Sequence, residues 1–464
     1  MPAGTGAGPS EDRAIGRVLN RDRLTGHGDR ELRQAALGIA EYALEAADPG
    51  AALRAQASFD GRLFRIAGRT IDLEKAPRVL VLGAGKATYP IAKGLEIMLG
   101  ARIDDGLVVL KRGQPGALDR IRLAWGGHPI PDGAGAAAAR EIADLARATG
   151  PGDVVFACIT GGSSALLPMP IDRITLAEKQ HVNRVLLASG ADIREVNSVR
   201  KHLSLLKGGG LAKTIHPEAV IVNLTVSDVT GDPLDYITDP TVPDSSTLDD
   251  ARATLDRHDL WRRLPRSVGD YLRHAGPDRE TPKAFPGRDI FSVILVPGDR
   301  AVGAALVRAR QLGFAPHLLA ADLEGDSEAA AGRFIDFARK LGAIESPVAV
   351  VAGGETTVRL CASPGRGGPN QTFALAMAPG LAGRARACAL GLDTDGTDGP
   401  TEMAGGLVDH LTAGAAERAC LDIAGHLARD DATTALEALG DAVQTGATGT
   451  NVNDLKLLLL APTS

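Results

Sequence analysis

The chain has 464 residues, of which 44% are hydrophobic and 23% are charged, and its formal net charge is −6. A chain of this length can form two or three domains, each with its own core. The acidic excess and the aromatic content of only 3% argue against nucleic acid and membrane surfaces as partners, because these need a basic patch or stacking side chains.

The cysteines and the N-terminal residues predict a cytoplasmic protein. The four cysteines are far apart and show no C-x-x-C spacing, which is typical of buried thiols in a reducing compartment. Residues 1–28 are expected to be a flexible tail, since they begin with small and polar residues and lack the apolar core of a signal peptide. No run reaches the roughly 18 apolar residues that a membrane-spanning helix needs.

Strands and helices are expected to alternate along the first part of the chain. Strands are predicted at 78–83, 106–110, 121–125, 153–159 and 219–226, and helices at 29–47, 87–99, 134–148, 175–188 and 193–206. This alternation predicts a mostly parallel sheet that is covered on both faces. Ligands of such sheets bind beyond the carboxyl ends of the strands.

The first glycine turn, Gly83-Ala84-Gly85-Lys86, joins a buried strand to a helix. This geometry presents backbone N–H groups and the positive end of the helix to an anion. A cation at Lys86 is unfavourable on dipole grounds, so we expect it to face an anionic ligand; the alternative is a surface lysine. The turn is not a complete dinucleotide fingerprint, because Thr88 replaces the third glycine, and it is not a Walker motif.

Three further segments of the first half carry candidate ligand-binding groups. Thr160–Ser164 is a second glycine loop whose hydroxyl and N–H groups suit phosphate, although such turns often end strands without any ligand. Arg200 and Lys207 lie in a basic helix end before three glycines; ordinary helix capping explains Lys207 better than Arg200. An acidic loop that contains Asp228 follows the strand at 219–226.

Residues 264–289 contain four prolines and many charges, which predicts a linker. A second run of elements follows, with strands at 292–296, 316–320, 348–351, 387–390 and 455–460 and helices at 301–312, 327–341 and 370–382. Arg366 lies among glycines in a loop of this part. Its planar guanidinium suits phosphoryl oxygens or a carboxylate, and the alternative is a solvent-facing arginine.

The acidic loop at 391–402 follows a buried strand and contains Asp393, Asp395, Asp398 and Glu402 among glycines. Carboxylates in one turn repel each other unless a cation or donor groups offset them. Mg²⁺ prefers oxygen ligands together with substrate phosphates. The sequence therefore suggests a site for Mg²⁺ and phosphate, and the alternative is a solvated turn in which Asp and Gly supply only the geometry.

Six motifs stand in collinear order from about Gly83 to Leu460. They are Gly83-Ala-Gly-Lys86, Asn197–Ser204 with Lys207-Gly-Gly, Ser227-Asp-Val with Gly231-Asp232, Gly353–Val358, Asp395–Thr401 and Thr448–Asp454. Together they resemble the glycerate 2-kinase family, whose C-terminal part is called the MOFRL domain. No one of these motifs is specific, but the ordered set is.

The resemblance implies an α/β enzyme with two domains and an active site in the cleft between them. A Rossmann-like domain with a mostly parallel sheet is expected at 29–288, including the linker, and an α/β MOFRL-type domain at 289–464. The implied reaction transfers the γ-phosphoryl group of ATP to the 2-hydroxyl of D-glycerate with Mg²⁺. The implied partner is thus a small hydroxylated molecule, and a homodimer is compatible with this interpretation.

Site residues are predicted from the resemblance and from the chemistry of phosphoryl transfer, which needs positioned cations and metal-bound phosphates. The catalytic residues expected are Lys86, Arg366 and Asp228. Nucleotide binding is expected of Gly161, Gly162, Ser163, Ser164, Lys207, Glu355 and Asn370. Substrate binding is expected of Gly85, Arg200 and Asp239, and metal binding of Asp395 and Asp398.

Four loops depart from the family pattern, at 161–164, 237–241, 367–372 and at 297–300, where Pro297-Gly298-Asp299-Arg300 replaces an asparagine-rich turn. The first has two glycines where three are usual, the second loses a glycine and gains Asp239, and the third loses an arginine and a glutamate. Specificity resides in such loops. Because these changes disfavour a small anionic acid, an acceptor such as a polyol or an amino compound is a second hypothesis.

Two other functions remain open. Reduction of hydroxypyruvate with a nicotinamide cofactor would use Gly83-x-Gly85, but Lys111 stands where an acidic residue would hold the ribose. A non-catalytic nucleotide-binding relative would account for the altered loops. Lys86, Arg366 and the Asp395 loop argue against that third hypothesis.

Overall fold

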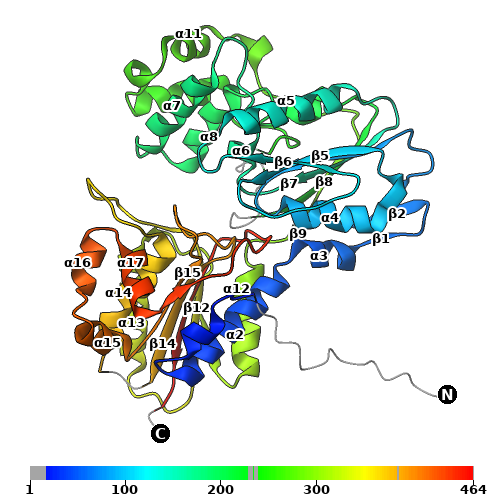
Figure 1. Ribbon diagram of the computed structural model, residues 1–464. Coiled ribbons are helices and arrows are strands. Elements are labelled where there is room, and N and C mark those ends of the chain that lie inside the picture. The colour runs from blue at the N-terminus through cyan, green and yellow to red at the C-terminus, as the bar shows by residue number, and fades with distance from the viewer. Residues whose placement is uncertain (1–16, 228–233, 235–238, 384–385, 463–464) are drawn as a thin grey trace, which may run out of the picture. The chain divides into compact units, whose positions relative to one another are not determined.

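The computed structural model describes residues 17–227, 234, 239–383 and 386–462, and the chain forms two compact units (Figure 1). The parallel-sheet unit contains Ala47–Arg300 and Gly449–Asn453. The mixed-sheet unit contains Met1–Ala46, Ala301–Thr448 and Asp454–Ser464. Two α/β units are what the sequence predicted. None of the described helices is both long and apolar enough to cross a membrane.

Parallel strands form the main sheet of the parallel-sheet unit. In spatial order they are β6 (Arg122–Gly126), β5 (Asp105–Lys111), β4 (Val79–Ala84), β7 (Val154–Ile159), β8 (Val220–Val226) and β9 (Ile290–Val296). The chain runs outward from β4 to one edge and then from β7 to the other edge. This is the Rossmann order, which reverses between β4 and β7, and ligands of such sheets bind beyond the carboxyl ends of the strands at that point.

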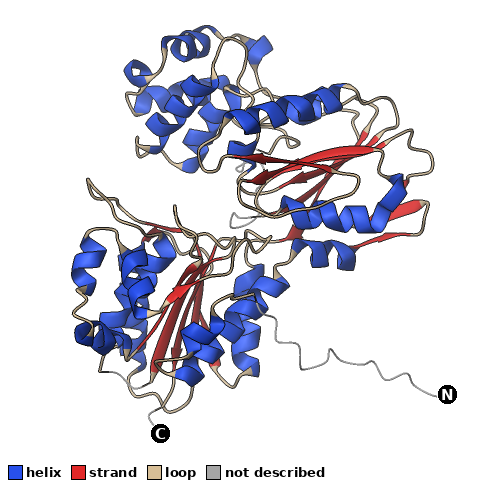
Figure 2. Ribbon diagram, viewed as in Figure 1, coloured by secondary structure: helices blue, strands red, loops and turns tan. Residues whose placement is uncertain are grey.

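Helices cover both faces of this sheet, as its fully buried central strands β4 and β7 require. α5 (Gly133–Arg147), α6 (Ser163–Leu166) and α9 (Gly210–Thr214) share a core with one face. α3 (Pro49–Gln56) and α4 (Thr88–Leu99) lie on the other face (Figures 1 and 2). An antiparallel sheet of β1 (Ala57–Phe59), β2 (Leu63–Ile66) and β3 (Arg69–Asp72) joins the unit, and its Phe64 ring packs edge-on against Phe156 of β7 at 4.9 Å.

A group of helices forms a second core within the parallel-sheet unit. It contains α7 (Leu176–Leu187), α8 (Ile193–His202), α10 (Leu248–Arg257) and α11 (Arg266–His274). Capping boxes begin α7, α8 and α10, each with an acidic side chain that returns to the N-cap backbone. The linker expected near 264–289 therefore contains a packed helix, α11, whose Val268 and Leu272 are buried.

The mixed-sheet unit is built on a second sheet. Its spatial order is β10 (Ala315–Ala320), β12 (Val348–Gly354), β17 (Asp454–Leu460), β14 (Ala387–Asp393), β15 (Gly405–Asp409) and β16 (Ala442–Val443). β10 and β12 pair in parallel, and the other described neighbours pair antiparallel. α13 (Ser327–Leu341), α14 (Pro369–Leu381) and α17 (Ala432–Leu439) share its main core. The unit also contains α12 (Arg300–Gln311), α15 (Thr412–Arg418), α16 (Ile423–Ala428), β11 (Gly325–Asp326) and β13 (Thr356–Thr357).

The N-terminal helix belongs to this second unit and not, as expected, to the first domain. α2 (Arg30–Ala46) packs on β14 and β17, and its Arg33 forms buried ion pairs with Asp409 and Asp441. Residues 17–28 of the expected tail contain α1 (Arg21–Thr25), and residues 1–16 lie outside the described residues. β9, which we expected in the second domain, completes the parallel sheet. Apolar periodicity predicts the type of an element but not the sheet that it will cover.

Candidate active site

Two glycine loops meet at the carboxyl ends of β4 and β7. Gly85 has a φ of +143°, and a Cβ atom there would lie 2.0 Å from Thr160 Oγ1. The same hydroxyl oxygen accepts a hydrogen bond of 3.1 Å from the N–H of Ala87. Only glycine allows both this conformation and this approach. The predicted substrate-binding residue Gly85 therefore joins the turn after β4 to the turn after β7.

Thr88 has a structural role at the position of the missing third glycine. Its fully buried hydroxyl donates a hydrogen bond of 2.9 Å to the carbonyl oxygen of Cys158. In a dinucleotide fingerprint this glycine permits close packing of helix on strand. Here a hydrogen bond fixes α4 to β7 instead.

Lys86 lies between the two glycine loops. Its N–H donates to the carbonyl oxygen of Gly161 at 2.9 Å, and its own carbonyl oxygen accepts from the Gln114 amide at 2.9 Å. A Cβ atom on Gly162 would lie 3.1 Å from Lys86 Cγ and 3.2 Å from His128 Cδ2. The half-buried Lys86 thus stands at the start of α4, whose first turn has no acidic residue. The sequence does not predict Gln114 and His128 as site residues, because neither belongs to a motif. Their only sign in the sequence is that each follows a strand of the sheet.

The second glycine loop continues into α6 and contacts Lys207. Gly162 has a φ of +87°, Ser163 is buried and Ser164 is half-buried. The ammonium group of Lys207 donates a hydrogen bond of 2.7 Å to the carbonyl oxygen of Ser164. Since α8 ends at His202, Lys207 does not cap that helix, which was the alternative explanation. The structure therefore brings four predicted nucleotide-binding residues and Lys207 together.

Lys207 belongs to a group of three cations, one of which the sequence analysis missed. Arg200 donates to the side-chain oxygen of Asn183 at 3.2 Å, and Lys179 of α7 donates to the carbonyl oxygen of Leu203 at 3.0 Å. Burial, and then the charge of Arg200, lower the pKa of Lys179 to about 7. Burial, Lys179 and Arg200 lower the pKa of Lys207 well below its ordinary value. Lys179 was missed because a single lysine in an amphipathic helix carries no signal of burial.

The two acidic residues predicted after β8 are not part of this arrangement. Asp228 lies outside the described residues. Asp239 is buried, and its carboxylate accepts hydrogen bonds from the N–H and hydroxyl of Thr241 at 2.6 and 2.7 Å and from Asn223 at 2.9 Å. Burial raises the pKa of Asp239 against the effect of these hydrogen bonds. The structure gives Asp239 the role of holding a turn inside the protein.

In the mixed-sheet unit, Asp398 binds the start of α14. One carboxylate oxygen accepts from the N–H of Asn370 at 3.0 Å, and the other accepts from the N–H of Gln371 at 2.8 Å. The side-chain amides of Asn370 and Gln371 donate to the same carboxylate at 3.2 and 3.0 Å. Burial, with a contribution from Asp454, raises the pKa of Asp398 to about 6 although these N–H groups oppose the shift. Its oxygens are thus occupied by helix N–H groups, which differs from the metal role expected of it.

Asn370 continues this contact into a buried polar network. Its amide also donates to Asp454 at 2.7 Å, and its side-chain oxygen accepts from the Lys456 ammonium at 3.0 Å. Lys456 in turn pairs with Asp454 at 2.7 Å. Asn370 is almost fully buried, so the structure uses it to join α14 to β17, whereas we had assigned it to the nucleotide.

Asp395 shapes the turn in the acidic loop. Its carboxylate accepts from the N–H and hydroxyl of Thr397 at 2.7 and 2.6 Å. Gly396 then takes a φ of +93°, and a Cβ atom there would lie 1.9 Å from the carbonyl oxygen of Gly446. The loop thus packs against the segment that precedes β17, a close approach that only glycine permits.

Arg366 and Glu355 are exposed residues of the mixed-sheet unit. The Arg366 guanidinium forms two hydrogen bonds with the Glu437 carboxylate, of 3.0 and 3.2 Å, which raise the pKa of Arg366. Its N–H donates to Asp431 at 3.0 Å. The arginine is therefore held against α17. Glu355 directly follows β12 at the carboxyl end of that strand.

The described residues contain no group of three or more His, Cys, Asp or Glu side chains that could hold a metal ion. Mg²⁺ commonly takes only one or two protein carboxylates and completes its shell with phosphates and water. Asp395 is the better candidate of the two predicted ligands, because the Asp398 oxygens already accept four N–H donors. Asp395 as a single protein ligand fits a metal ion that is held mainly by phosphates.

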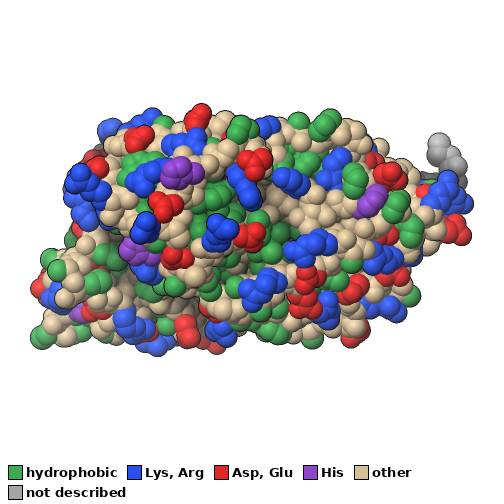
Figure 3. All heavy atoms as spheres, turned by 90° about the horizontal axis from the view of Figure 1, so that it is seen from above, with side chains coloured by type: hydrophobic (Ala, Val, Ile, Leu, Met, Phe, Trp, Pro, Cys, Tyr) green, Lys and Arg blue, Asp and Glu red, His purple; other side chains and the backbone are tan. Residues whose placement is uncertain are grey.

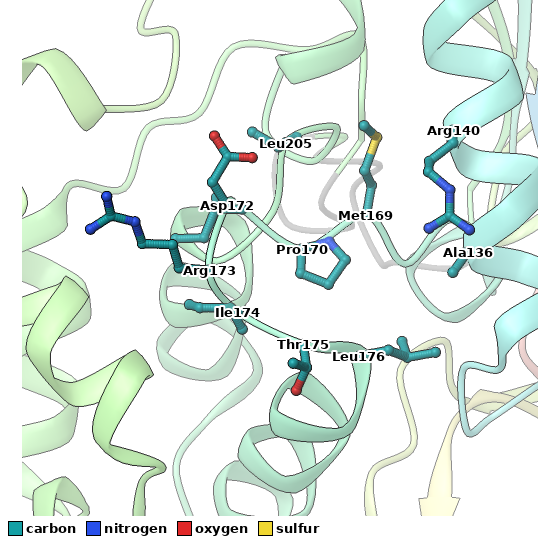
Figure 4. Close-up of a pocket in the computed structure, with 11 residues that line it drawn as sticks. Ala136, Arg140, Met169, Pro170, Asp172, Arg173, Ile174, Thr175, Leu176 and Leu205 are labelled. Atoms are coloured by element: carbon teal, nitrogen blue, oxygen red, sulfur yellow. The ribbon is translucent and has the colours of Figure 1, made fainter.

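Two surface hollows lie elsewhere in the parallel-sheet unit. One, of about 390 Å³, lies between α5 and the segment Met169–Leu176; Figure 4 shows Arg140 of α5 on one side of it and Arg173 pointing away. The other, of about 420 Å³, includes Lys207 in its wall. Neither is lined by Lys86 or by residues 161–164. On the face seen in Figure 3, basic and acidic side chains are interspersed. The second hollow is also lined by Lys201 and Lys213, but it does not include the glycine loops.

Comparison with known proteins identifies relatives over most of the chain. The MOFRL family model matches residues 348–454, and the model of a domain of unknown function, DUF4147, matches residues 35–273. A glycerate 2-kinase of Pyrococcus horikoshii is 35% identical over 440 residues, which are 93% of this chain and 98% of that protein. A protein of Agrobacterium vitis named putative hydroxypyruvate reductase is 39% identical over 389 residues, which are 82% of this chain and 99% of that protein.

A solved structure shares the fold. The crystal structure of a glycerate kinase from Thermotoga maritima superposes with a TM-score of 0.76 at 32% identity, and the match covers 93% of this chain and 99% of that one.

Proposed function

The chain belongs to the glycerate 2-kinase family, and from this premise we propose that it transfers the γ-phosphoryl group of ATP to the 2-hydroxyl of D-glycerate. It is a phosphotransferase with an alcohol group as acceptor. The observation that carries the proposal is the position of Lys86 between two interlocked glycine loops, where the strand order reverses. The start of α4 and the ammonium group of Lys86 at that point suit a polyphosphate, and the N–H groups of Lys86 and Ala87 hold the two loops together.

Phosphoryl transfer requires little covalent work from the protein, and catalysis is mostly positioning and charge stabilisation. We propose that Lys86 stabilises the negative charge of the transferred phosphoryl group. The loop Gly161–Ser164 would orient the phosphates through its N–H and hydroxyl groups. Mg²⁺, when bound, would neutralise phosphate charge, and Asp395 is our candidate to hold it.

Arg366 is proposed as the second catalytic cation. It is paired with Glu437 on the protein surface, and an exposed pair of this kind contributes little to stability. The guanidinium can therefore exchange Glu437 for phosphoryl oxygens at little cost. Three further roles stay predictions: catalysis for Asp228, nucleotide binding for Glu355 and substrate binding for Gly85.

The altered loops do not require a different acceptor. Asp239 is engaged by Thr241 and Asn223, so its added charge is not offered to a ligand. Pro369 is the first residue of α14, where proline fits the backbone, and Thr372 is buried. Contacts within the protein thus account for these differences without a new ligand, which favours D-glycerate over a polyol or an amino compound.

The reductase alternative is less well supported. β5, the strand next to β4, ends in Lys111 where an acidic residue would bind a ribose, and Thr88 replaces the third glycine. This chain matches a relative named putative hydroxypyruvate reductase, but 93% of it also matches a glycerate 2-kinase. The name of the first relative therefore does not favour the reductase. A cytoplasmic location, a homodimer and the absence of nucleic-acid or membrane partners stay predictions.

The test is ADP formation from ATP and D-glycerate, with glycerol in parallel, and NADH oxidation with hydroxypyruvate. We expect turnover with D-glycerate alone, and Lys86→Met should reduce kcat by about a hundredfold or more, as loss of a charge-stabilising group does. Lys93→Met is the matched control, since Lys93 is an exposed lysine of the same helix. NADH oxidation without ADP formation, or full activity of Lys86→Met, would reject the proposal.

A further inference from the structure

Two buried lysines differ from the other buried basic residues of the described chain. The buried basic residues there are Arg33, Lys179, Lys201, His202, Lys207 and Lys456. Four of them contact carboxylates, namely Arg33, Lys201, His202 and Lys456. Lys179 and Lys207 donate to main-chain carbonyl oxygens, and no carboxylate of the described residues pairs with either. A buried cation without an opposite charge is costly, so this exception needs a reason.

Arg200 adds a third positive charge to the same place. It lies close enough to Lys179 and Lys207 to disfavour their protonated forms, and Lys179 has the same effect on Lys207. The hydrogen bonds of Arg200 go to the neutral side chains of Asn183 and Asn197. Like charges that converge in a desolvated place repel each other. A bound anion would offset both the desolvation and the repulsion.

The cluster reaches the ligand loop and the surface. Lys207 is hydrogen-bonded to Ser164 of the second glycine loop at 2.7 Å. Arg200, Asn183 and Ser164 are half-buried rather than enclosed, so an anionic group can reach the edge of the cluster. The two lysines and the arginine come from α7, α8 and the segment after α8, which fixes their spacing through the core of these helices.

We propose that Lys179, Arg200 and Lys207 form one subsite for an oxyanion, a carboxylate or a phosphoryl group, of the ligand that binds at Gly161–Ser164. The inference rests on the proposed function and deepens it. It adds Lys179 as a ligand-binding residue. It also gives Arg200 and Lys207 a common ligand, whereas the sequence suggests that Arg200 binds the substrate and Lys207 the nucleotide. Charge-assisted hydrogen bonds to all three cations would hold the oxyanion.

The first experiment is calorimetric titration of the full-length protein at pH 6.5 with ATP and, separately, with D-glycerate. Lys179→Met, Lys207→Met and Arg200→Gln should each weaken binding of the same one of these ligands by about tenfold or more, the size expected for a hydrogen bond to a charged group. The exposed Lys213→Met is the control and should bind both ligands as the parent does. Lys179→Arg keeps the charge and should retain most of the affinity.

The two ligands distinguish the sources of the oxyanion. Weaker binding of D-glycerate with unchanged binding of ATP would show that the subsite holds the acceptor carboxylate; the reverse would show that it holds nucleotide phosphate. Glycerol, which lacks the carboxylate, should not respond to the variants. The inference is overturned if Lys179→Met binds both ligands like the parent. It is also overturned if Arg200→Gln and Lys207→Met affect different ligands.

Failure of the subsite and failure of the kinase function give different results. If the parent protein phosphorylates D-glycerate but Lys179→Met binds both ligands normally, only the subsite is wrong. If the three variants lose affinity for one anion but the parent makes no ADP with D-glycerate, the subsite stands and the proposed reaction is wrong. Circular dichroism of each variant confirms that the comparison is made on folded protein.

Discussion

The ammonium group of Lys179 lies 3.0 Å from the main-chain carbonyl oxygen of Leu203, a neutral acceptor in a fully buried place. On the next helix, the ammonium group of Lys201 lies 2.9 Å from a carboxylate oxygen of Asp244, with both side chains buried. The two lysines therefore have similar burial and opposite electrostatic surroundings. Burial opposes ionisation of Asp244, but Lys201 and neighbouring donors lower its pKa.

This contrast predicts opposite effects of one substitution on stability. At pH 7 and without ligand, Lys201→Met should lower the free energy of unfolding by about 3 kcal/mol, because Asp244 is left as a buried charge without its cation. Lys179→Met should raise it by about 1 kcal/mol, because an unpaired buried charge is replaced by an apolar side chain of similar length. Urea unfolding of the two variants measures both values. A large loss of stability in Lys179→Met would show that the lysine has a structural anionic partner.

The pKa of Lys179 predicts how stability depends on pH. Its folded-state pKa is lowered to about 7 from the ordinary 10.5, so between these values the unfolded chain holds more protons than the folded one. Stability then rises with pH in this window, by up to about 1.4 kcal/mol per pH unit for one such group. The slope between pH 7.5 and 9.5 should be smaller in Lys179→Met than in the parent. Equal slopes in guanidinium or urea titrations would contradict the prediction.

Asp398 should matter for stability more than for metal binding. Asp398→Ala removes the acceptor for four N–H groups at the start of α14, and we expect a loss of about 3 kcal/mol from the lost cap and the unsatisfied donors. The control Asp336→Ala removes an exposed carboxylate and should change stability by less than about 0.5 kcal/mol. The Mg²⁺ concentration that gives half-maximal activity should not change in Asp398→Ala. A strongly increased Mg²⁺ requirement would restore the metal role.

The contact between the two glycine loops should be intolerant of a single methyl group. In Gly85→Ala the new Cβ atom would lie 2.0 Å from Thr160 Oγ1 at a positive φ, so we expect a loss of about 3 kcal/mol from overpacking and backbone strain, together with loss of ATP binding. Gly133→Ala is the control, since no atom within 4 Å meets its Cβ. Thermal unfolding of both variants tests this, and equal midpoints would show that the loops can separate freely.

Much of the fold could be predicted because it depends on local periodicity. The expected strands at 78–83, 153–159 and 219–226 correspond to β4, β7 and β8, and the expected helix at 327–341 coincides with α13. The glycine loops after β4 and β7 were also found, because a glycine turn after a buried strand is a local signal. The short β1–β3 sheet and α11 were missed, since brief strands and a proline-rich segment have weak periodicity.

The amino-acid sequence by itself determined the two α/β units, the glycine turns and, through six ordered motifs, the enzyme family. Tertiary structure alone decided which charges are paired. Asp398, Asn370 and Asp239 looked like ligands in the sequence but are occupied by helix N–H groups, Lys456 and Thr241. Lys179 looked like an ordinary helix residue but lies buried beside Arg200 and Lys207. The reason is physical: a spacing along the chain specifies secondary structure, whereas burial and the nearest opposite charge depend on elements that are distant in sequence.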